Sequence, residues 1–155
     1  MSAAARRRIG DASAHDAHEL DALMSRVIAH ALGADAAVLS ATLENVRANL
    51  EWSMANPDRC CHLTCTVDET LAGVILVKHF WNLCSLFVAP ELQRAGIGRE
   101  LMLASIERCR GRSDKNALWL NAATNAVAFY ERLGFTERAS AQPLPAGFRA
   151  MQLGL

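Results

Sequence analysis

The chain has 155 residues, the length of one ordinary domain that can bury a core of its own. Its 16 basic and 16 acidic side chains give a formal net charge of zero, which argues against partners such as nucleic acid or an anionic membrane surface. The basic start ARRR, residues 5–8, is followed by no apolar segment of signal-peptide or membrane-spanning length. We therefore expect one cytoplasmic domain, residues 1–155.

Two amphipathic helices are predicted after a short first strand near Ile9. Ser13 and Asp16 form a capping-box pattern with Asp in place of Glu. Apolar residues then recur twice at helical spacing, first as Leu20, Leu23, Met24, Val27, Ile28, Ala31 and Leu32, and then as Val38, Leu39, Leu43, Val46, Leu50 and Met54. We expect Gly33 to end the first helix and the turn at residues 56–58 to end the second.

The segment CCHLTC, residues 60–65, holds three of the five cysteines. The odd number of cysteines suits reduced thiols better than a disulfide framework. The segment also suggests zinc, but a strand would place Cys61 and Cys65 on one face and Cys60 and His62 on the other. Because no second ligand cluster follows downstream, we predict buried cysteines and no metal.

Strands and helices alternate after residue 60. CHLTCTV, LAGVILVK and LCSLFVA read as three strands of an antiparallel meander that Pro90 ends. A helix follows from about Gly98 to Arg110, with inward-facing Leu101, Met102, Ser105, Ile106 and Cys109. The strand ALWLNA, with Trp119 in the core, and the helix NAVAFYERL, closed by Gly134, come next, and one or two strands, among them FRAMQL, complete the chain. This order indicates a mixed α/β (α+β) fold.

The segment LQRAGIGREL, residues 92–101, lies where the third strand of the meander passes into a helix. The first N–H groups of a helix have no internal partner, so they favour an anion of phosphate size. Gly96 and Gly98 let the backbone come close to such an anion, and Gln93 and Arg94 add side-chain donors. The segment lacks the Lys and hydroxyl of a Walker A loop and the third glycine of a Rossmann fingerprint, which disfavours ATP, GTP and NAD.

Two segments resemble signatures of the GCN5-related N-acetyltransferases, the GNAT family. LFVAPELQRAGIGRELM, residues 86–102, is similar to the acyl-CoA signature [RQ]-x-x-G-x-[GA], with Gln93, Gly96 and Gly98 at its fixed positions. NAVAFYERLGF, residues 125–135, resembles the second signature A-x-x-[FL]-Y-E-x-x-G-F. The element order is family-like over nearly the whole chain, although only residues 84–135 carry specific motifs.

The resemblance implies a mostly antiparallel sheet with helices on both faces, and acetyl-CoA held between two splayed strands, here LCSLFVA and ALWLNA. Backbone groups of Leu86, Phe87 and Val88 would pair with the pantetheine arm and polarise the thioester. The pyrophosphate would lie on Gln93, Arg94, Ala95, Gly96, Ile97, Gly98 and Arg99. An amine would attack the thioester directly, and Tyr130, the single tyrosine, would protonate the leaving thiolate, unless its ring only packs in the core.

Two positions depart from the family pattern. Ala123 stands seven residues before Tyr130, where the family often has Asn or Ser against the pantetheine, and Asn121 or Asn125 could replace that contact. Asn121 also stands where many relatives carry the carboxylate that takes the proton of the amine. No general base is therefore assigned, and the candidates are Glu44, Glu51, His79 and Cys84, whereas Glu131 and Arg132 read as a solvated helix face.

The sequence thus predicts an acetyl-CoA-dependent N-acetyltransferase acting on a primary amine of a small molecule, peptide or protein. The acceptor would be held by the first two helices, their connection at residues 33–35 and the loop SAQPLPAG, residues 140–147. The missing carboxylate keeps a second hypothesis open, a non-catalytic acyl-CoA-binding or interaction module. The identity of the acceptor, the length of the acyl chain and the presence of a homodimer are not determined.

Overall fold

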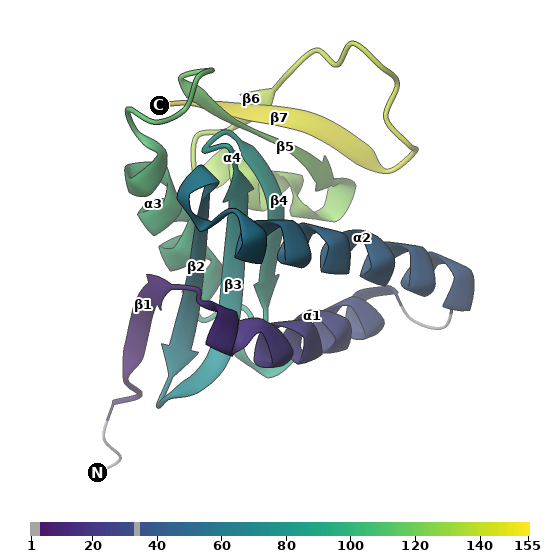
Figure 1. Cartoon of the computed structure of the whole chain (residues 1–155). Coiled ribbons are helices and arrows are strands. Elements are labelled where there is room, and N and C mark those ends of the chain that lie inside the picture. The colour runs from purple at the N-terminus through teal and green to yellow at the C-terminus, as the bar shows by residue number, and fades with distance from the viewer. Residues whose placement is uncertain (1–3, 33–34) are drawn as a thin grey trace.

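The chain folds around a seven-stranded sheet with strand order β1-β2-β3-β4-β5-β7-β6 (Figure 1). The computed structural model describes residues 4–32 and 35–155. Strands β1 (Arg7–Asp11), β2 (Cys60–Val67), β3 (Thr70–Lys78) and β4 (Asn82–Val88) are antiparallel neighbours. Strand β5 (Ala117–Ala123) is parallel to β4, and β7 (Phe148–Gly154) lies between β5 and the short β6 (Thr136–Glu137). The mostly antiparallel sheet confirms the predicted fold class.

Helices cover both faces of this sheet. Helices α1 (Ala17–Leu32) and α2 (Ala36–Ala55) lie on one face, and α3 (Ile97–Cys109) and α4 (Val127–Arg132) lie on the other, as Figure 1 shows. The predicted order of elements is confirmed, and of the one or two final strands expected the structure has two, β6 and β7. Within the described residues no helix is both long and apolar enough to cross a membrane.

Local sequence signals account for the helix boundaries. The backbone N–H of Ser13 donates to the Asp16 carboxylate at 2.8 Å, as the capping-box pattern predicted. Asp35 caps α2 by accepting hydrogen bonds from the N–H groups of Ala37 and Val38. Helix α2 ends at Ala55, directly before the predicted turn. Gly33, the expected end of the first helix, lies outside the described residues.

Each face of the sheet has its own apolar cluster. Between the sheet and α1 and α2, the cluster contains Leu20, Leu23, Met24, Val27, Ile28, Val46 and Leu50 together with Val74 and Ala89. On the other face, all five predicted inward residues of α3 are buried. Complete burial of one leucine or isoleucine side chain stabilises the fold by roughly 1.5–3 kcal/mol. Val38, at the start of the second apolar pattern, is 46% exposed and adds little to this core.

Trp119 does not lie in the core, contrary to the prediction. Its neighbours Leu118 and Leu120 take the positions of β5 that face α3 and α4, so alternation turns Trp119 to the opposite face. There the half-buried indole packs edge-on against Trp81, with a centroid distance of 5.5 Å. Lys115 lies over the indole at 4.2 Å and Arg138 at 4.1 Å.

The segment CCHLTC is the first part of β2, and its side chains alternate as expected. Cys61 and Cys65 are buried in the cluster beneath α3. Cys60 and His62 line a hollow near Ser53 and Met54 on the other face. Within the described residues, no three His, Cys, Asp or Glu side chains lie close enough to hold a metal ion. The four side chains of the suspected motif therefore do not converge.

We expect protein purified without added metal to contain no stoichiometric zinc, because a tetrahedral site needs ligands that point to one centre. Elemental analysis before and after dialysis tests this expectation. Zinc at one equivalent that survives dialysis would contradict it. A variant with Cys60→Ser is the control, since a true site would lose affinity with the loss of one ligand.

His62 is expected to make the fold sensitive to acid. Burial lowers the pKa of His62 from 6.5 to about 4. Between pH 6.5 and 4, His62 is protonated in the unfolded chain but stays neutral in the folded chain. The contribution of His62 to stability is therefore present above pH 6.5 and is lost as the pH falls toward 4. We expect His62→Gln to reduce the decrease in the free energy of unfolding between pH 7 and 4 by on the order of 1 kcal/mol. Urea unfolding from pH 7 to 4 tests this, with replacement of the exposed His18 by Gln as the control. The same dependence of the free energy of unfolding on pH in both variants would contradict the prediction.

Candidate functional site

Strands β4 and β5 diverge soon after they meet. Their ladder has one register pair, Asn82 with Trp119, where the Trp119 N–H donates to the Trp81 carbonyl at 2.7 Å. Next along β4, Cys84 is an extra residue in the pairing with β3, because Leu76 pairs with Ser85 and Val77 with Leu83. Such a bulge bends a strand and increases its twist. The two parallel strands thus form a wedge that opens toward Val88.

The backbone of β4 presents alternate residues to this wedge. The Ala89 N–H donates to the Ala72 carbonyl on β3 at 2.8 Å. Because backbone groups alternate along an antiparallel strand, those of Phe87 also face β3, whereas those of Leu86 and Val88 face the wedge. The Gln93 side chain donates to the Val88 carbonyl at 3.1 Å. The N–H of Val88 and both backbone groups of Leu86 are thus directed at the opening.

The N-terminus of α3 lies beside the mouth of the wedge. Gly96 caps the helix with φ of +86°, a left-handed conformation that glycine adopts without a steric penalty. The first intrahelical bond runs from Glu100 N–H to the Gly96 carbonyl, so the N–H groups of residues 97–99 precede it and have no helical partner. The segment therefore supplies several converging donors and the positive end of the helix dipole.

A hollow of about 730 Å³ lies between the free edge of β4 and this helix end. It brings together nine of the residues predicted from the sequence, namely Leu86, Val88, Gln93, Arg94, Gly96, Ile97, Gly98, Arg99 and Tyr130. Phe87, Ala95, Asn121 and Asn125 do not line it. The Phe87 side chain packs in the cluster of α1 and α2, and Asn121 lies on the exposed face of β5.

Sequence reasoning missed two kinds of lining residue. Val27 reaches the hollow from α1, a contact that only the packing of the helix on the sheet creates. Arg132, expected on a solvated helix face, is exposed but lies at the mouth with Arg94 and Arg99. None of these three arginines forms an ion pair with another described residue. The mouth is therefore positively charged, which suits a ligand with several phosphate groups.

Tyr130 lies on α4 at the inner wall of the hollow. Its side chain is 9% exposed and packs edge-on against Phe129 and Phe135, at centroid distances of 5.1 and 5.5 Å. Burial raises the pKa of Tyr130 from 10 to about 12, so the phenol is protonated at neutral pH. Within the described part of the chain, its hydroxyl group makes no hydrogen bond to protein. The proton is thus available to a ligand.

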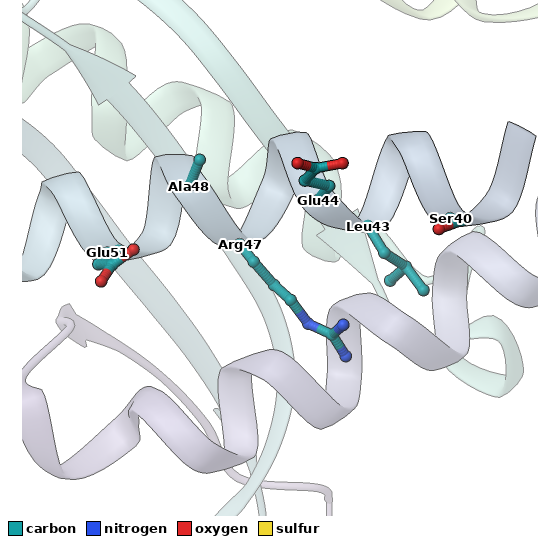
Figure 2. Close-up of a pocket in the computed structure, with 6 residues that line it drawn as sticks. All are labelled: Ser40, Leu43, Glu44, Arg47, Ala48 and Glu51. Carbon is teal, nitrogen blue, oxygen red and sulfur yellow. The ribbon is translucent and has the colours of Figure 1, made fainter.

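The candidate general bases do not line this hollow. Glu44 and Glu51 lie along α2, where Figure 2 shows Arg47 reaching toward α1 and Glu44 pointing away from it. Arg47 pairs with Asp21 of α1 at 2.8 Å. His79 packs edge-on against Trp52. Burial raises the pKa of the Cys84 thiol, which disfavours the thiolate that a base would need. None of the four therefore shares the hollow with Tyr130.

The chain is similar to acetyltransferases in sequence. The acetyltransferase (GNAT) domain model matches residues 27–153. Over 86 residues the chain is 35% identical to the [ribosomal protein bS18]-alanine N-acetyltransferase of Salmonella typhimurium, and the alignment covers 52% of this chain and 57% of that enzyme. The chain thus matches little more than half the length of this relative.

Solved structures share the fold over nearly the full length. The PaiA N-acetyltransferase of Thermoplasma acidophilum, solved in complex with coenzyme A, superposes with a TM-score of 0.76 at 18% identity, covering 97% of this chain and 99% of that chain. The ribosomal-protein-S18-alanine N-acetyltransferase of Escherichia coli superposes with a TM-score of 0.67 at 22% identity, covering 96% and 93%.

Proposed function

This chain belongs to the GNAT acetyltransferase family, and we propose that it transfers an acetyl group from acetyl-CoA to a primary amine. One observation carries the proposal: the free edge of β4, the N-terminus of α3 and Tyr130 border the same hollow. Each of the three supplies a different need of the reaction, namely binding of an extended thiol arm, binding of phosphate and delivery of a proton.

The binding step uses the backbone of the wedge and the charges at its mouth. The pyrophosphate accepts hydrogen bonds from the N–H groups of residues 97–99, with Arg94, Arg99 and Arg132 as the nearby cations. The pantetheine arm pairs with the free edge of β4 at Leu86 and Val88, as an added strand would. This geometry directs the thioester toward the narrow end of the wedge.

The chemical step is a direct transfer. A neutral amine attacks the thioester carbonyl carbon, whose oxygen is stabilised by an N–H group of β4. The C–S bond breaks, and Tyr130 gives its proton to the departing sulfur. Burial raises the pKa of Tyr130 to about 12, so the phenol holds its proton until the thiolate forms. The proton of the amine passes to solvent, and the Tyr130 phenolate takes a proton back from solvent, so the enzyme ends the cycle as it began.

The acceptor class we test first is the α-amine of a protein. The Salmonella relative acts, by its name, on alanine of ribosomal protein bS18, which makes peptides with an N-terminal alanine the first members of the panel. Lysine side chains in blocked peptides and small amines complete it. A non-catalytic acyl-CoA-binding module is the second candidate, favoured by the amide of Asn121 where many relatives carry a carboxylate.

Two measurements separate the candidates. Native mass spectrometry of the purified protein shows whether a CoA species is bound and whether the protein is a homodimer. Release of CoA is then followed by chromatography across the amine panel, because the five free cysteines of the protein would obscure a thiol reagent. Turnover with any amine supports the enzyme, and binding of acetyl-CoA without turnover across the panel supports the module. Absence of acetyl-CoA binding would reject both.

A further inference from the structure

We propose that Arg7, on the first strand, is a positioning residue for the cofactor. Its guanidinium holds the loop before α3 in the conformation that presents free N–H groups to the pyrophosphate, and it neutralises an acidic side chain beside them. The inference rests on the proposed function, because it assumes that acetyl-CoA binds at the N-terminus of α3. Arg7 carries no feature in the sequence that links it to the glycine-rich segment.

Two contacts join Arg7 to that segment. One guanidinium nitrogen donates to the Ala95 carbonyl, and the other donates to the Glu100 carboxylate at 2.8 Å. A planar guanidinium presents its donors as a fixed fork, so the two contacts restrain the loop and the first helical turn together. The side chains of Arg7 and Glu100 are 32% and 43% exposed, and neither lines the hollow, so the effect of Arg7 on a ligand there is exerted through the loop and through charge.

The contact with Ala95 determines where the next N–H group points. In a planar trans peptide the carbonyl oxygen of one residue and the N–H of the next lie on opposite sides. Because Arg7 holds the Ala95 carbonyl toward β1, the Gly96 N–H is directed away from β1. Residues 94 and 96 both have positive φ, of +66° and +86°, a conformation that Arg94 in particular does not favour on its own. A tertiary contact that stabilises this loop therefore prepares it for the anion.

The contact with Glu100 removes an electrostatic obstacle. Glu100 lies in the first turn of α3, the turn whose N–H groups face the proposed pyrophosphate. An unpaired carboxylate there would repel the phosphate charges. The ion pair with Arg7 cancels that charge without involving Arg94 or Arg99.

A second ion pair between the same two elements serves as an internal comparison. Arg108, in the last turn of α3, donates to Asp11 at the end of β1 at 2.6 Å. Both pairs join β1 to α3, but the Arg108 pair lies at the helix end remote from the hollow. If Arg7 only fastened β1 to α3, loss of either arginine would have the same consequence.

The experiment measures acetyl-CoA affinity by calorimetry for the wild type, Arg7→Ala, Arg108→Ala, Arg7→Lys and the double variant Arg7→Ala/Glu100→Ala. We expect Arg7→Ala to weaken binding about three- to tenfold and Arg108→Ala to leave it within about twofold. Arg7→Lys retains the charge but not the fork, and the double variant removes the exposed carboxylate, so each should recover part of the affinity. Thermal unfolding of each variant reports its stability separately.

An acetyl donor without phosphate groups distinguishes positioning of the cofactor from a purely structural role of Arg7. S-acetylpantetheine lacks the phosphates, so Arg7→Ala should leave kcat/KM for this donor unchanged while lowering it for acetyl-CoA. Three results would overturn the inference while the proposed function stands. They are unchanged acetyl-CoA affinity in Arg7→Ala, equal losses of affinity in Arg7→Ala and Arg108→Ala, and equal losses of kcat/KM with both acetyl donors. A wild type that does not bind acetyl-CoA would reject the proposed function and the inference together.

Discussion

Replacement of Tyr130 by phenylalanine is expected to lower kcat by roughly a hundredfold or more, the typical effect of losing an acid-base group. The dissociation constant of acetyl-CoA should change little, because the aromatic ring that lines the hollow stays in place. Binding by calorimetry and single-turnover acetyl transfer, measured on an acceptor for which the chemical step limits the rate, separate the two quantities. Full turnover by the variant would show that Tyr130 is not the general acid and that its ring only packs.

Tyr130→Phe removes the hydroxyl group without disturbing the packing around the ring. The hydroxyl has no hydrogen-bond partner among the described residues, so its removal leaves no buried group unsatisfied. The edge-on contacts of the ring with Phe129 and Phe135 are retained by phenylalanine. A Phe135→Leu variant is the matched control, since it disturbs the packing of the same ring but keeps the proton. We expect the control to lose some stability and to retain far more turnover than Tyr130→Phe.

The pH profile provides an independent check of the assignment. Because burial raises the pKa of Tyr130 to about 12, this group stays protonated throughout the usual assay range. The rate should therefore rise with pH as the acceptor amine loses its proton, with no falling limb in the usual assay range that belongs to Tyr130. A falling limb near pH 9 would point to a different acid.

Gly96→Val is expected to weaken acetyl-CoA binding at least tenfold, equivalent to about 1.4 kcal/mol. Gly96 has φ of +86°, which a β-branched residue strongly resists, and it borders the hollow where the pyrophosphate is proposed to bind. Valine would strain the backbone that presents the N–H donors, and its Cβ would lie 3.7 Å from a guanidinium nitrogen of Arg7. Calorimetry on the folded variant provides the measurement, and unchanged affinity would remove this loop from the binding site.

The strain itself needs a control, because a left-handed valine costs stability wherever it occurs. Gly111 has φ of +74°, and a Cβ there would meet no atom within 4 Å. It follows the C-terminal end of α3, at the opposite end of the helix from Gly96. Gly111→Val should therefore lose a similar amount of stability, roughly 1–2 kcal/mol, and keep its affinity for acetyl-CoA.

Local signals in the sequence were sufficient for most of the element order and for part of the site. Apolar periodicity predicted the inward face of α3, from Leu101 to Cys109, because residues three or four apart in a helix lie on the same face. The glycine-rich segment predicted the helix end that lies beside the hollow, because free N–H groups and positive φ are properties of a few adjacent residues.

Other features depend on contacts between distant parts of the chain. Periodicity shows that β5 has two different faces, but only the packing of α3 and α4 decides that Leu118 is covered and Trp119 is not. Likewise, the bulge at Cys84 exists only in the pairing with β3, so the wedge between β4 and β5 could not be located from either strand alone.

The sequence by itself identified the residues on which the proposed chemistry rests, namely a glycine-rich helix end and a single phenol in family-like motifs. The tertiary structure decided which residues share the hollow: it includes Val27 and Arg132, excludes Phe87 and Asn121, and brings Arg7 from the first strand to Ala95 and Glu100. Local propensities act over a few neighbouring residues, whereas the direction of a side chain in space is set by strand register and layer packing across the whole chain.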